Sequence, residues 1–263
     1  MTTAAVPAPP ARPGREVRVA VVVPCFDEVL TVGGVVDAVR AALPGAQVHV
    51  VDNASTDGTA AAAAAHGAVV HHEPRPGKGH AVRRAFQDVD ADVYVLLDGD
   101  GTYDAAAAGA LVDLLLTGGH DVVVGTRRPA SATAHRPGHA AGNRALNGLV
   151  NGLFGTRYTD MLSGYRVMSR AFVASFPARS TGFEVETEMA VHAAVGGFSC
   201  VEVPLGFTDR PAGSVSKLRT VRDGLRIAAC AVRLSRTRPA VGDAPGPSPR
   251  RSLLQSPRRS PVR

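Results

Sequence analysis

The chain has 263 residues, 45% of them hydrophobic and 5% aromatic, which is enough for one domain with a sizeable core and excludes a disordered chain in its middle part. The net charge of +6 lies at the ends: residues 1–18 carry +2, residues 235–263 carry +6, and residues 19–234 carry −2. The basic isoelectric point therefore gives no reason to expect a nucleic-acid partner, and the acidic core suits a metal or a metal-bound nucleotide.

The cysteines and the hydropathy of the chain indicate the cellular compartment in which the protein works. Cys25, Cys200 and Cys230 are far apart and form no C-x-x-C pair, so neither a disulfide framework nor a zinc site is expected. A reducing, cytoplasmic compartment fits this pattern best. The proline-rich N-terminus lacks the apolar region of a signal peptide, and no run of about 18 apolar residues predicts a transmembrane helix.

In the first half of the chain, β-branched segments alternate with helix-like segments. Strands are predicted over residues 17–24, 47–51, 68–71, 93–97 and 121–125, and helices over residues 31–43, 59–66, 79–87 and 105–116. This alternation predicts an α/β sandwich with a largely parallel sheet, in one domain over residues 17–234. The Pro/Ala-rich arm (1–16) and the Pro/Ser/Arg-rich tail (235–263) are predicted to be disordered.

After residue 126 this alternation stops. The polar residues 127–139 are expected to form a loop. Strands are predicted over residues 165–169 and 200–205, and helices over residues 140–155, 184–195 and 218–234. The helix over 140–155 is amphipathic, which suits either packing on the core or contact with a membrane surface.

Acidic residues follow three of the predicted strands. Asp27 and Glu28 come after the first strand, Asp52 after the second, and Asp98 and Asp100 after the fourth. Ligands bind open α/β sheets at the carboxyl ends of parallel strands. Carboxylates gathered at that edge need a cation or hydrogen-bond donors, so a ligand site is expected there.

The Asp98-Gly99-Asp100 motif suits a hard divalent cation. Two carboxylates two residues apart, with a glycine that lets a ligand approach the backbone, can hold Mg²⁺ or Mn²⁺ bridging a diphosphate. The alternative is an Asp-Gly turn of the kind that commonly follows a strand. Asp52 suits either a hydrogen bond from a nucleobase or an Asx turn before the next helix.

Lysine is nearly absent from this chain. Of 29 Lys and Arg residues, only Lys78 and Lys217 are lysine. These two are either chance survivors or positions that need a compact ammonium in place of a planar guanidinium. Lys78 lies between two glycines before a predicted helix, where a nucleotide can bind, although the P-loop pattern is absent.

Taken in order, these segments resemble the family 2 glycosyltransferases with a GT-A fold, and most of all the polyprenyl- and dolichol-phosphate sugar synthases. The resemblance covers residues 19–227. It rests on V-V-V-P-C-F-D-E (21–28), V-V-D-N-A-S-T-D-G-T (50–59), G-K-G-H-A-V (77–82), L-L-D-G-D-G-T-Y-D (96–104), V-G-T-R (124–127), D-M-L-S-G-Y-R (160–166), G-F-E-V-E-T-E-M (182–189), E-V-P (202–204), R-P-A-G-S-V-S-K-L (210–218) and D-G-L-R-I (223–227).

The resemblance implies a GT-A fold, with a mostly parallel central sheet and helices on both faces. It also implies an inverting hexosyltransferase that uses Mg²⁺ or Mn²⁺ and moves a sugar from a UDP- or GDP-sugar to a polyprenyl phosphate, as in the synthesis of cell-envelope glycans. The oxygen of a lipid phosphate acceptor is already anionic, so no strong general base is required, and the rate depends on positioning and on metal-assisted departure of the diphosphate.

The resemblance also assigns roles to single residues. The nucleotide would be lined by Pro24, Asp27, Glu28, Asp52 and Lys78, and the metal and diphosphate would be held by Asp98 and Asp100. The acceptor phosphate or donor diphosphate would be surrounded by Arg127, Arg144 and Lys217, and the acceptor side shaped by Asp160, Ser163, Gly164 and Arg166. The catalytic candidates are Asp100, Asp160, Arg127 and Lys217, and the sugar or acceptor would meet one of Glu184, Glu186 and Glu188.

The sequence departs from the family pattern in places. Asp27 stands where Asn is usual, residues 52–55 read D-N-A-S in place of D-D-G-S, and Thr102 replaces a metal-binding Gln of dolichol-phosphate mannose synthases. Where many relatives continue into membrane helices this chain turns to Pro, Ser and Arg, so a peripheral contact with the inner face of the cytoplasmic membrane is expected. The alternatives are a soluble hydroxyl acceptor, with Asp160 as base, and a nucleotide-sugar-binding relative without turnover.

Overall fold

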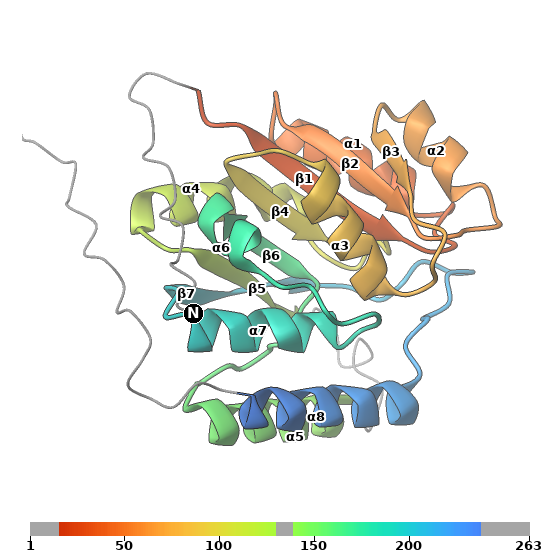
Figure 1. The fold of residues 1–263 in the computed structure, drawn as a ribbon. Helices are drawn as coiled ribbons and strands as arrows, with labels where there is room; N and C mark the ends of the chain where they lie inside the picture. Colours follow the sequence, from red (N-terminus) through yellow and green to blue (C-terminus); the bar gives the residue numbers. More distant parts are fainter. Residues whose placement is uncertain (1–15, 130–138, 238–263) are drawn as a thin grey trace, which may run out of the picture.

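The computed structural model describes residues 16–129 and 139–237 (Figure 1). Its strands are β1 (Val19–Cys25), β2 (Gln47–Asp52), β3 (Val69–His72), β4 (Val93–Leu97), β5 (Val122–Pro129), β6 (Tyr165–Ser169) and β7 (Cys200–Phe207). The expected N-terminal arm and most of the expected C-terminal tail lie outside the described residues.

The seven strands form one sheet in the order β3-β2-β1-β4-β6-β5-β7. Strand β6 runs antiparallel to both of its neighbours, β4 and β5, and the other neighbouring pairs are parallel. The prediction of an α/β fold with a mostly parallel sheet is confirmed. The runs of Val and Leu in β1 and β4 are buried because helices cover both faces of the sheet.

The helices are α1 (Val32–Ala42), α2 (Thr59–Ala65), α3 (Lys78–Asp88), α4 (Ala108–Gly118, after the short 3-10 helix η1, Ala105–Ala107), α5 (His139–Phe154), α6 (Arg170–Ser175), α7 (Val185–Val195) and α8 (Thr220–Arg236). Side chains of β1 alternate between the two cores: Val21 packs with α1 and α4, and Val22 with α3 and α7. Helices α5 and α8 lie side by side as an outer layer on α7 (Figure 1), joined to it by a third cluster that includes Met161 and Ile227.

Two elements differ from the sequence prediction. Residues 127–129 were expected in a loop but extend β5, because they pair in register with residues 205–207 of β7. The short helix α6 was not predicted; Ser169 caps it by accepting a hydrogen bond from the backbone N–H of Phe172 at 3.2 Å. In the described part of the chain, none of the helices is both long and apolar enough to span a bilayer.

Two non-glycine residues adopt left-handed backbone conformations in the loops that follow β1 and β2. Asp27 has φ 50° and Ala54 has φ 61°. Asp27 tolerates this because its Oδ1 accepts a hydrogen bond from the backbone N–H of Thr56 at 2.8 Å. Ala54 has no polar side chain that could compensate for this backbone conformation.

Replacing Ala54 with glycine is expected to raise the free energy of unfolding by up to about 1 kcal/mol, because glycine adopts positive φ without steric strain. Urea unfolding followed by circular dichroism measures the change. The matched control is Ala64→Gly on the exposed side of α2, where the same substitution should lower the free energy of unfolding by about 1 kcal/mol. A loss of stability in Ala54→Gly would contradict the assigned strain.

Candidate functional site

The loops at the carboxyl edge of the sheet bring together residues that are far apart in sequence. Strands β1, β2, β4, β5 and β7 all point their carboxyl ends to this edge. Because β6 is antiparallel, its amino end lies at the same edge, and Leu97 of β4 pairs with Tyr165. Residues 160–164, which precede β6, are therefore placed beside Asp98.

A cleft of about 370 Å³ opens at this edge. One wall carries carboxylates from the strand ends, namely Glu28, Asp98 and Asp100. The segment 216–226 also contributes to the lining, with Asp223 among four cations that we call the basic wall: Lys217, Arg219, Arg222 and Arg226. A cleft with an acidic wall and a basic wall suits a ligand that carries a cation at one end and an anion at the other.

Lys78 lies between two carboxylates on the floor of the site. Its Nζ is 2.5 Å from Asp98 Oδ1 and 2.5 Å from Glu186 Oε1, and only 11% of its side chain is exposed. Burial alone would lower the pKa of Lys78, but the two carboxylates raise it above its usual value, so the ammonium is charged. This contact ties the start of α3 to the end of β4 and to α7.

Arg210, just beyond β7, neutralises the other two carboxylates. Its Nη1 is 3.0 Å from Glu28 Oε1 and its Nη2 is 2.6 Å from Asp100 Oδ2. Thr102 orients Asp100 from the opposite side, since its backbone N and its Oγ1 both donate to Asp100 Oδ1, at 3.1 and 2.6 Å. Arg210 was not among the residues singled out from the sequence; the signal for it was a cation placed directly after a strand end.

Four carboxylates in the site pair with only two cations of the protein. We call these carboxylates the acidic cluster: Glu28, Asp98, Asp100 and Glu186. Burial raises the pKa of Asp98 to about 6; Lys78 opposes this, and Asp100 and Glu186 add to it. Glu186 Oε2 is buried without a hydrogen-bond partner. Excess negative charge on hard oxygen donors fits a divalent cation at Asp98 and Asp100.

The described residues supply only part of such a coordination shell. Within residues 16–129 and 139–237, no three His, Cys, Asp or Glu side chains are grouped so that they could hold a metal ion by themselves. Gly164 keeps the place of Asp98 open, because a Cβ at this position would overlap the Asp98 carboxylate. The cation would thus be held by Asp98 and Asp100 together with oxygens of a ligand.

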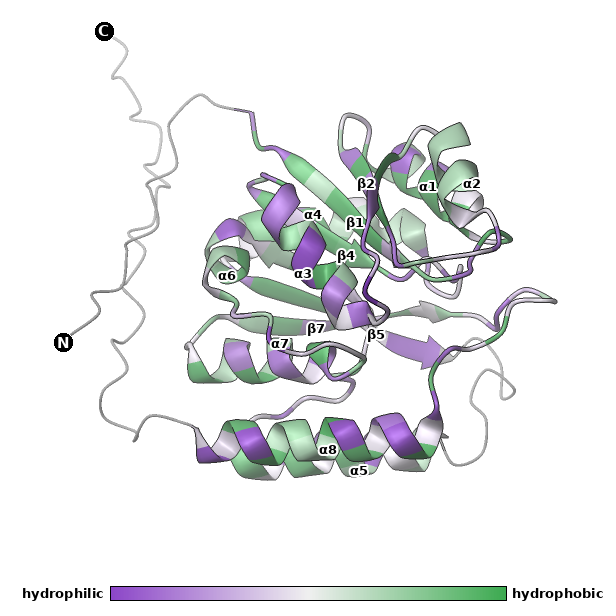
Figure 2. Cartoon of the chain, turned by 45° about the vertical axis from the view of Figure 1, so that its right-hand side comes forward, coloured by the Kyte–Doolittle hydropathy of each residue, from purple (hydrophilic) through white to green (hydrophobic). Residues whose placement is uncertain are grey.

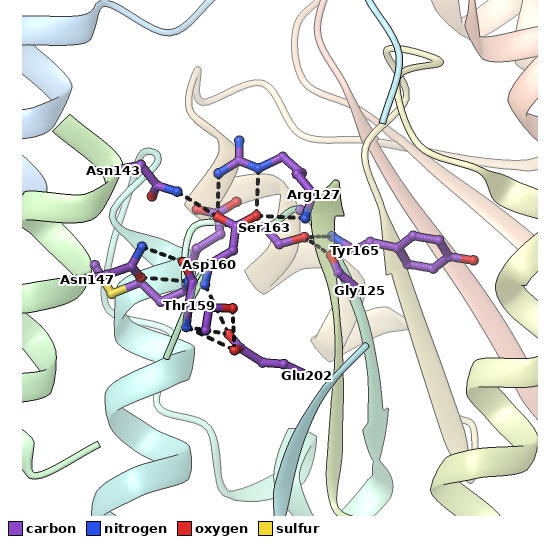
Figure 3. A network of polar contacts seen from close by, with 12 residues as sticks. Gly125, Arg127, Asn143, Asn147, Thr159, Asp160, Ser163, Tyr165 and Glu202 are labelled. Atoms are coloured by element: carbon purple, nitrogen blue, oxygen red, sulfur yellow. Dashed lines mark hydrogen bonds and ion pairs between the residues drawn. The ribbon is translucent and has the colours of Figure 1, made fainter. Parts of the chain in front are cut away.

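A second polar network is centred on Asp160 (Figure 3). The carboxylate accepts hydrogen bonds from Arg127 Nε at 2.8 Å, from Arg127 Nη2 at 2.6 Å and from the Arg127 backbone N at 3.0 Å. Asn143 Nδ2 donates to it as well, at 3.0 Å. Burial alone would raise the pKa of Asp160, but Arg127 and Asn143 hold it below the usual value.

Tyr103 links this network to the cleft. Its Oη accepts a hydrogen bond from the Gly164 backbone N at 2.8 Å and lies 3.3 Å from Ser163 Oγ. Ser163 Oγ also donates to the Gly125 carbonyl of β5. The turn that carries Asp160 is therefore fixed to β5 and, through Gly164, to the place of Asp98.

Several of the predicted site residues gather in the cleft. The lining includes Pro24, Glu28, Lys78, Asp98, Asp100 and Lys217. Asp27 is not part of this lining, but its carbonyl accepts a hydrogen bond from Lys217 Nζ at 3.0 Å. The expected trio of Arg127, Arg144 and Lys217 is divided: Arg127 belongs to the Asp160 network, and Arg144 is exposed on α5.

Asp52 lies outside the lining of the cleft, whereas its neighbour Asn53 is part of it. The cleft lining includes Asn53 but not Asp52, which is buried at the end of β2. The Asn53 side chain is used to hold the loop before α3, by hydrogen bonds to the Glu73 and Arg75 carbonyls and from the Gly77 N–H. Asp52 Oδ1 is buried without a hydrogen-bond partner in the described chain, and its Oδ2 lies 3.4 Å from His72 Nδ1.

The three glutamates at spacing two lie at the start of α7, so they point in different directions. Glu184 accepts from Arg226, Glu186 pairs with Lys78, and Glu188 caps the Arg179 and Ser180 N–H groups. Of the three, Glu186 belongs to the acidic cluster. The side chain of Arg166 is buried beneath the site, where it donates to the Met161 carbonyl.

The comparison with protein families gives one match: the model of glycosyl transferase family 2 matches residues 20–174. The glycosyltransferase AglJ of Haloferax volcanii is 38% identical over 211 residues, which cover 78% of this chain and 68% of AglJ. An undecaprenyl-phosphate mannosyltransferase of Micrococcus luteus is 28% identical over 214 residues, which cover 74% of this chain and 86% of that enzyme.

Among solved structures, this chain is similar to a glucosyl-3-phosphoglycerate synthase of Mycobacterium tuberculosis, crystallised with Mn²⁺, uridine diphosphate and phosphoglyceric acid. The TM-score is 0.66, the identity is 24%, and the match covers 86% of this chain and 81% of the other. At this identity the likeness concerns the fold, which agrees with the α/β architecture described above.

Asp160→Asn is expected to lower the free energy of unfolding by about 3 kcal/mol at pH 7, because it leaves the Arg127 guanidinium without its carboxylate. The pKa of Asp160 is lower in the folded state than its unfolded value of about 4. Its stabilising effect is therefore complete above about pH 4 and is lost as the pH falls through the folded-state value. Urea unfolding of both proteins from pH 7 to pH 3 should show their difference shrink in acid; a difference that grows in acid would contradict this assignment.

Proposed function

The chain belongs to glycosyl transferase family 2, whose members transfer a sugar from a nucleotide-sugar, and we propose that its acceptor is a polyprenyl phosphate. The observation that carries the proposal is the cleft at the carboxyl edge of the sheet, whose lining combines the carboxylates with the cations of the basic wall. This edge is where nucleotides bind open α/β folds. The name of the Micrococcus luteus relative, with its lipid phosphate acceptor, supports the acceptor.

In this proposal the donor lies in the cleft with its nucleoside toward Asn53 and its diphosphate toward the basic wall. Mn²⁺ or Mg²⁺ at Asp98 and Asp100 would neutralise charge on the leaving nucleoside diphosphate. Thr102 and Arg210 orient Asp100 for this role, and Lys78 does the same for Asp98. The likeness to a synthase crystallised with Mn²⁺ and uridine diphosphate supports this arrangement.

The reaction is a displacement at the anomeric carbon of the sugar. An oxygen of the acceptor phosphate forms the new bond as the bond to the diphosphate breaks, so the configuration inverts. The phosphate oxygen is already anionic, so no base has to remove a proton, and the protein contributes orientation and positive charge. Arg127 and Lys217 are the cations proposed to receive the acceptor phosphate and the donor diphosphate.

Helix α8 supports a lipid acceptor over a soluble one. Its inner side, with Ile227 and Ala231, packs into the third apolar cluster, and its outer side exposes Val221 at 76% and Leu225 at 68%. Figure 2 shows hydrophilic and hydrophobic residues interleaved along it. The exposed cations on this helix include Arg222, Arg233 and Arg236. Exposed apolar side chains among arginines suit the surface of an anionic membrane, next to the cleft.

The two lysines offer a direct test of the donor site. Lys78→Arg is expected to weaken binding of uridine or guanosine diphosphate at least tenfold, about 1.4 kcal/mol, because a planar guanidinium does not fit between Asp98 and Glu186. Lys217→Arg should bind almost as the unchanged protein does, since either cation can donate to the Asp27 carbonyl. Calorimetry with Mn²⁺ present measures both. Unchanged affinity in Lys78→Arg would mean that this lysine is a chance survivor.

The acceptor is tested with undecaprenyl phosphate in anionic vesicles, a panel of nucleotide-sugars and Mn²⁺. The double variant Val221→Ser/Leu225→Ser is expected to lose at least tenfold in initial rate, because about 2 kcal/mol or more of apolar contact with the bilayer is removed. Leu116→Ser, which changes an exposed leucine on α4 across the sheet, is the matched control and should keep the rate.

If none of the donors gives a glycolipid product, the proposal of a lipid acceptor is wrong. Transfer to a soluble hydroxyl compound without lipid would replace it by the alternative that the phosphoglyceric acid complex of the structural relative suggests. Donor binding with neither transfer nor donor hydrolysis would instead indicate a binding protein without turnover.

A further inference from the structure

The turn between α5 and β6 is held by an unusual set of side chains. Asn143, Asn147 and Asn151 stand four residues apart on one face of α5, and we call them the asparagine ladder. Asn151 binds the start of the turn, by accepting from the Tyr158 N at 2.8 Å and donating to the Tyr158 carbonyl at 2.9 Å.

The ladder continues toward Asp160. Asn147 forms hydrogen bonds with the backbone on both sides of Asp160. Its Nδ2 donates to the Thr159 carbonyl at 3.0 Å, and its Oδ1 accepts from the Met161 N at 2.9 Å. Asn143 binds the Asp160 carboxylate itself. The ladder thus fixes first the path of the turn and then the carboxylate.

Glu202 of β7 supports the same turn from the other side (Figure 3). Its Oε2 accepts from the Thr159 N at 2.9 Å and from Thr159 Oγ1 at 2.7 Å, and its Oε1 accepts from the Asp160 N at 3.1 Å. A carboxylate used in this way is an unusually strong anchor, because three donors converge on it. Asp160 is therefore held by its backbone from β7 and by its carboxylate from α5.

These hydrogen bonds to Asp160 also fix the side chain that it binds, the Arg127 guanidinium. Asp160 holds Arg127 with a two-point contact through Nε and Nη2, and the guanidinium also lies 5.7 Å from the centre of the Phe207 ring. Nη1 takes no part in the contact with Asp160. The Asp160 oxygens are saturated by Arg127 and Asn143, and its pKa is low, so the carboxylate is poorly suited to remove a proton.

We propose that Asp160 is a positioning residue that aims Arg127 at the acceptor phosphate, and that Asn143 and Glu202 are positioning residues which act through it. This assignment rests on the proposed phosphate acceptor. It replaces the alternative expected from the sequence, in which Asp160 is the base for a hydroxyl acceptor. Planar, two-point contact with a carboxylate leaves a guanidinium oriented for an anion on its remaining edge.

The test is a mutant cycle on the full chain, with binding of farnesyl phosphate and of farnesol measured by calorimetry in the presence of Mn²⁺ and a nucleoside diphosphate. Asn143→Leu and Glu202→Gln are each expected to weaken farnesyl phosphate binding about tenfold, the scale of a misplaced contact group. Neither should change the affinity for the nucleoside diphosphate. In an Arg127→Ala background both should have less than a twofold effect, because a residue that acts through Arg127 has nothing left to position.

Asn151→Leu is the matched control, because it removes a hydrogen bond from the same turn without touching Asp160 or Arg127. It should lower stability in unfolding experiments as Asn143→Leu does, and leave the affinity for farnesyl phosphate within twofold. A purely structural role of the turn would instead weaken binding equally in both variants, and would overturn the proposal.

The remaining outcomes separate the two proposals. If the unchanged protein binds farnesyl phosphate no better than farnesol, the phosphate acceptor is wrong, and the role of Arg127 falls with it. If farnesyl phosphate is preferred but Asn143→Leu and Glu202→Gln keep full affinity, or retain their tenfold effects without Arg127, the acceptor stands and the positioning role is overturned.

Discussion

The contact of Lys78 with two carboxylates is the interaction on which the site depends. A single buried ammonium pairs with Asp98, which follows β4, and with Glu186 of α7, and its own position is set by the start of α3. Removing the cation would leave two carboxylates together in a poorly solvated place, which is costly. The compact ammonium explains why a chain that uses arginine almost everywhere retains lysine here. Arg210 pairs with the remaining carboxylates, Glu28 and Asp100, and the excess of negative charge is the basis of the proposed divalent cation.

One reversal in the sheet brings the two halves of the site together. Strand β6 is antiparallel between β4 and β5, so the turn before it reaches the edge where its parallel neighbours end. Gly164 lies directly against Asp98, and Asp160 meets Arg127 at the end of β5. The two halves of the site are thus built from different kinds of contact: a charge-dense cleft on the β1–β4 side, and a hydrogen-bonded, rigid turn on the β5–β7 side.

Much of this could be predicted from the sequence, and the limits have physical causes. The β–α alternation and the acidic residues after strands are local patterns, so the sheet and the carboxylates of the cleft were predictable. The place of β6 in the strand order is a property of distant pairings that no local pattern encodes. For the same reason the partners of Lys78 and the role of Arg210 were not predicted, and β5 proved longer than expected. Asn143 was not among the predicted site residues, because the carboxylate it binds lies 17 residues further along the chain.

The account rests on a nucleoside diphosphate that binds the cleft together with a divalent cation at Asp98 and Asp100. The most direct test is calorimetric titration with uridine and guanosine diphosphate, with and without Mn²⁺, on the unchanged protein, on Asp100→Asn, and on Asp37→Asn as an exposed carboxylate control on α1. We predict binding of one nucleotide that strengthens at least tenfold, about 1.4 kcal/mol, with Mn²⁺, and that loses this gain in Asp100→Asn but keeps it in Asp37→Asn. Equal affinity with and without Mn²⁺, or an unchanged gain in Asp100→Asn, would contradict the account.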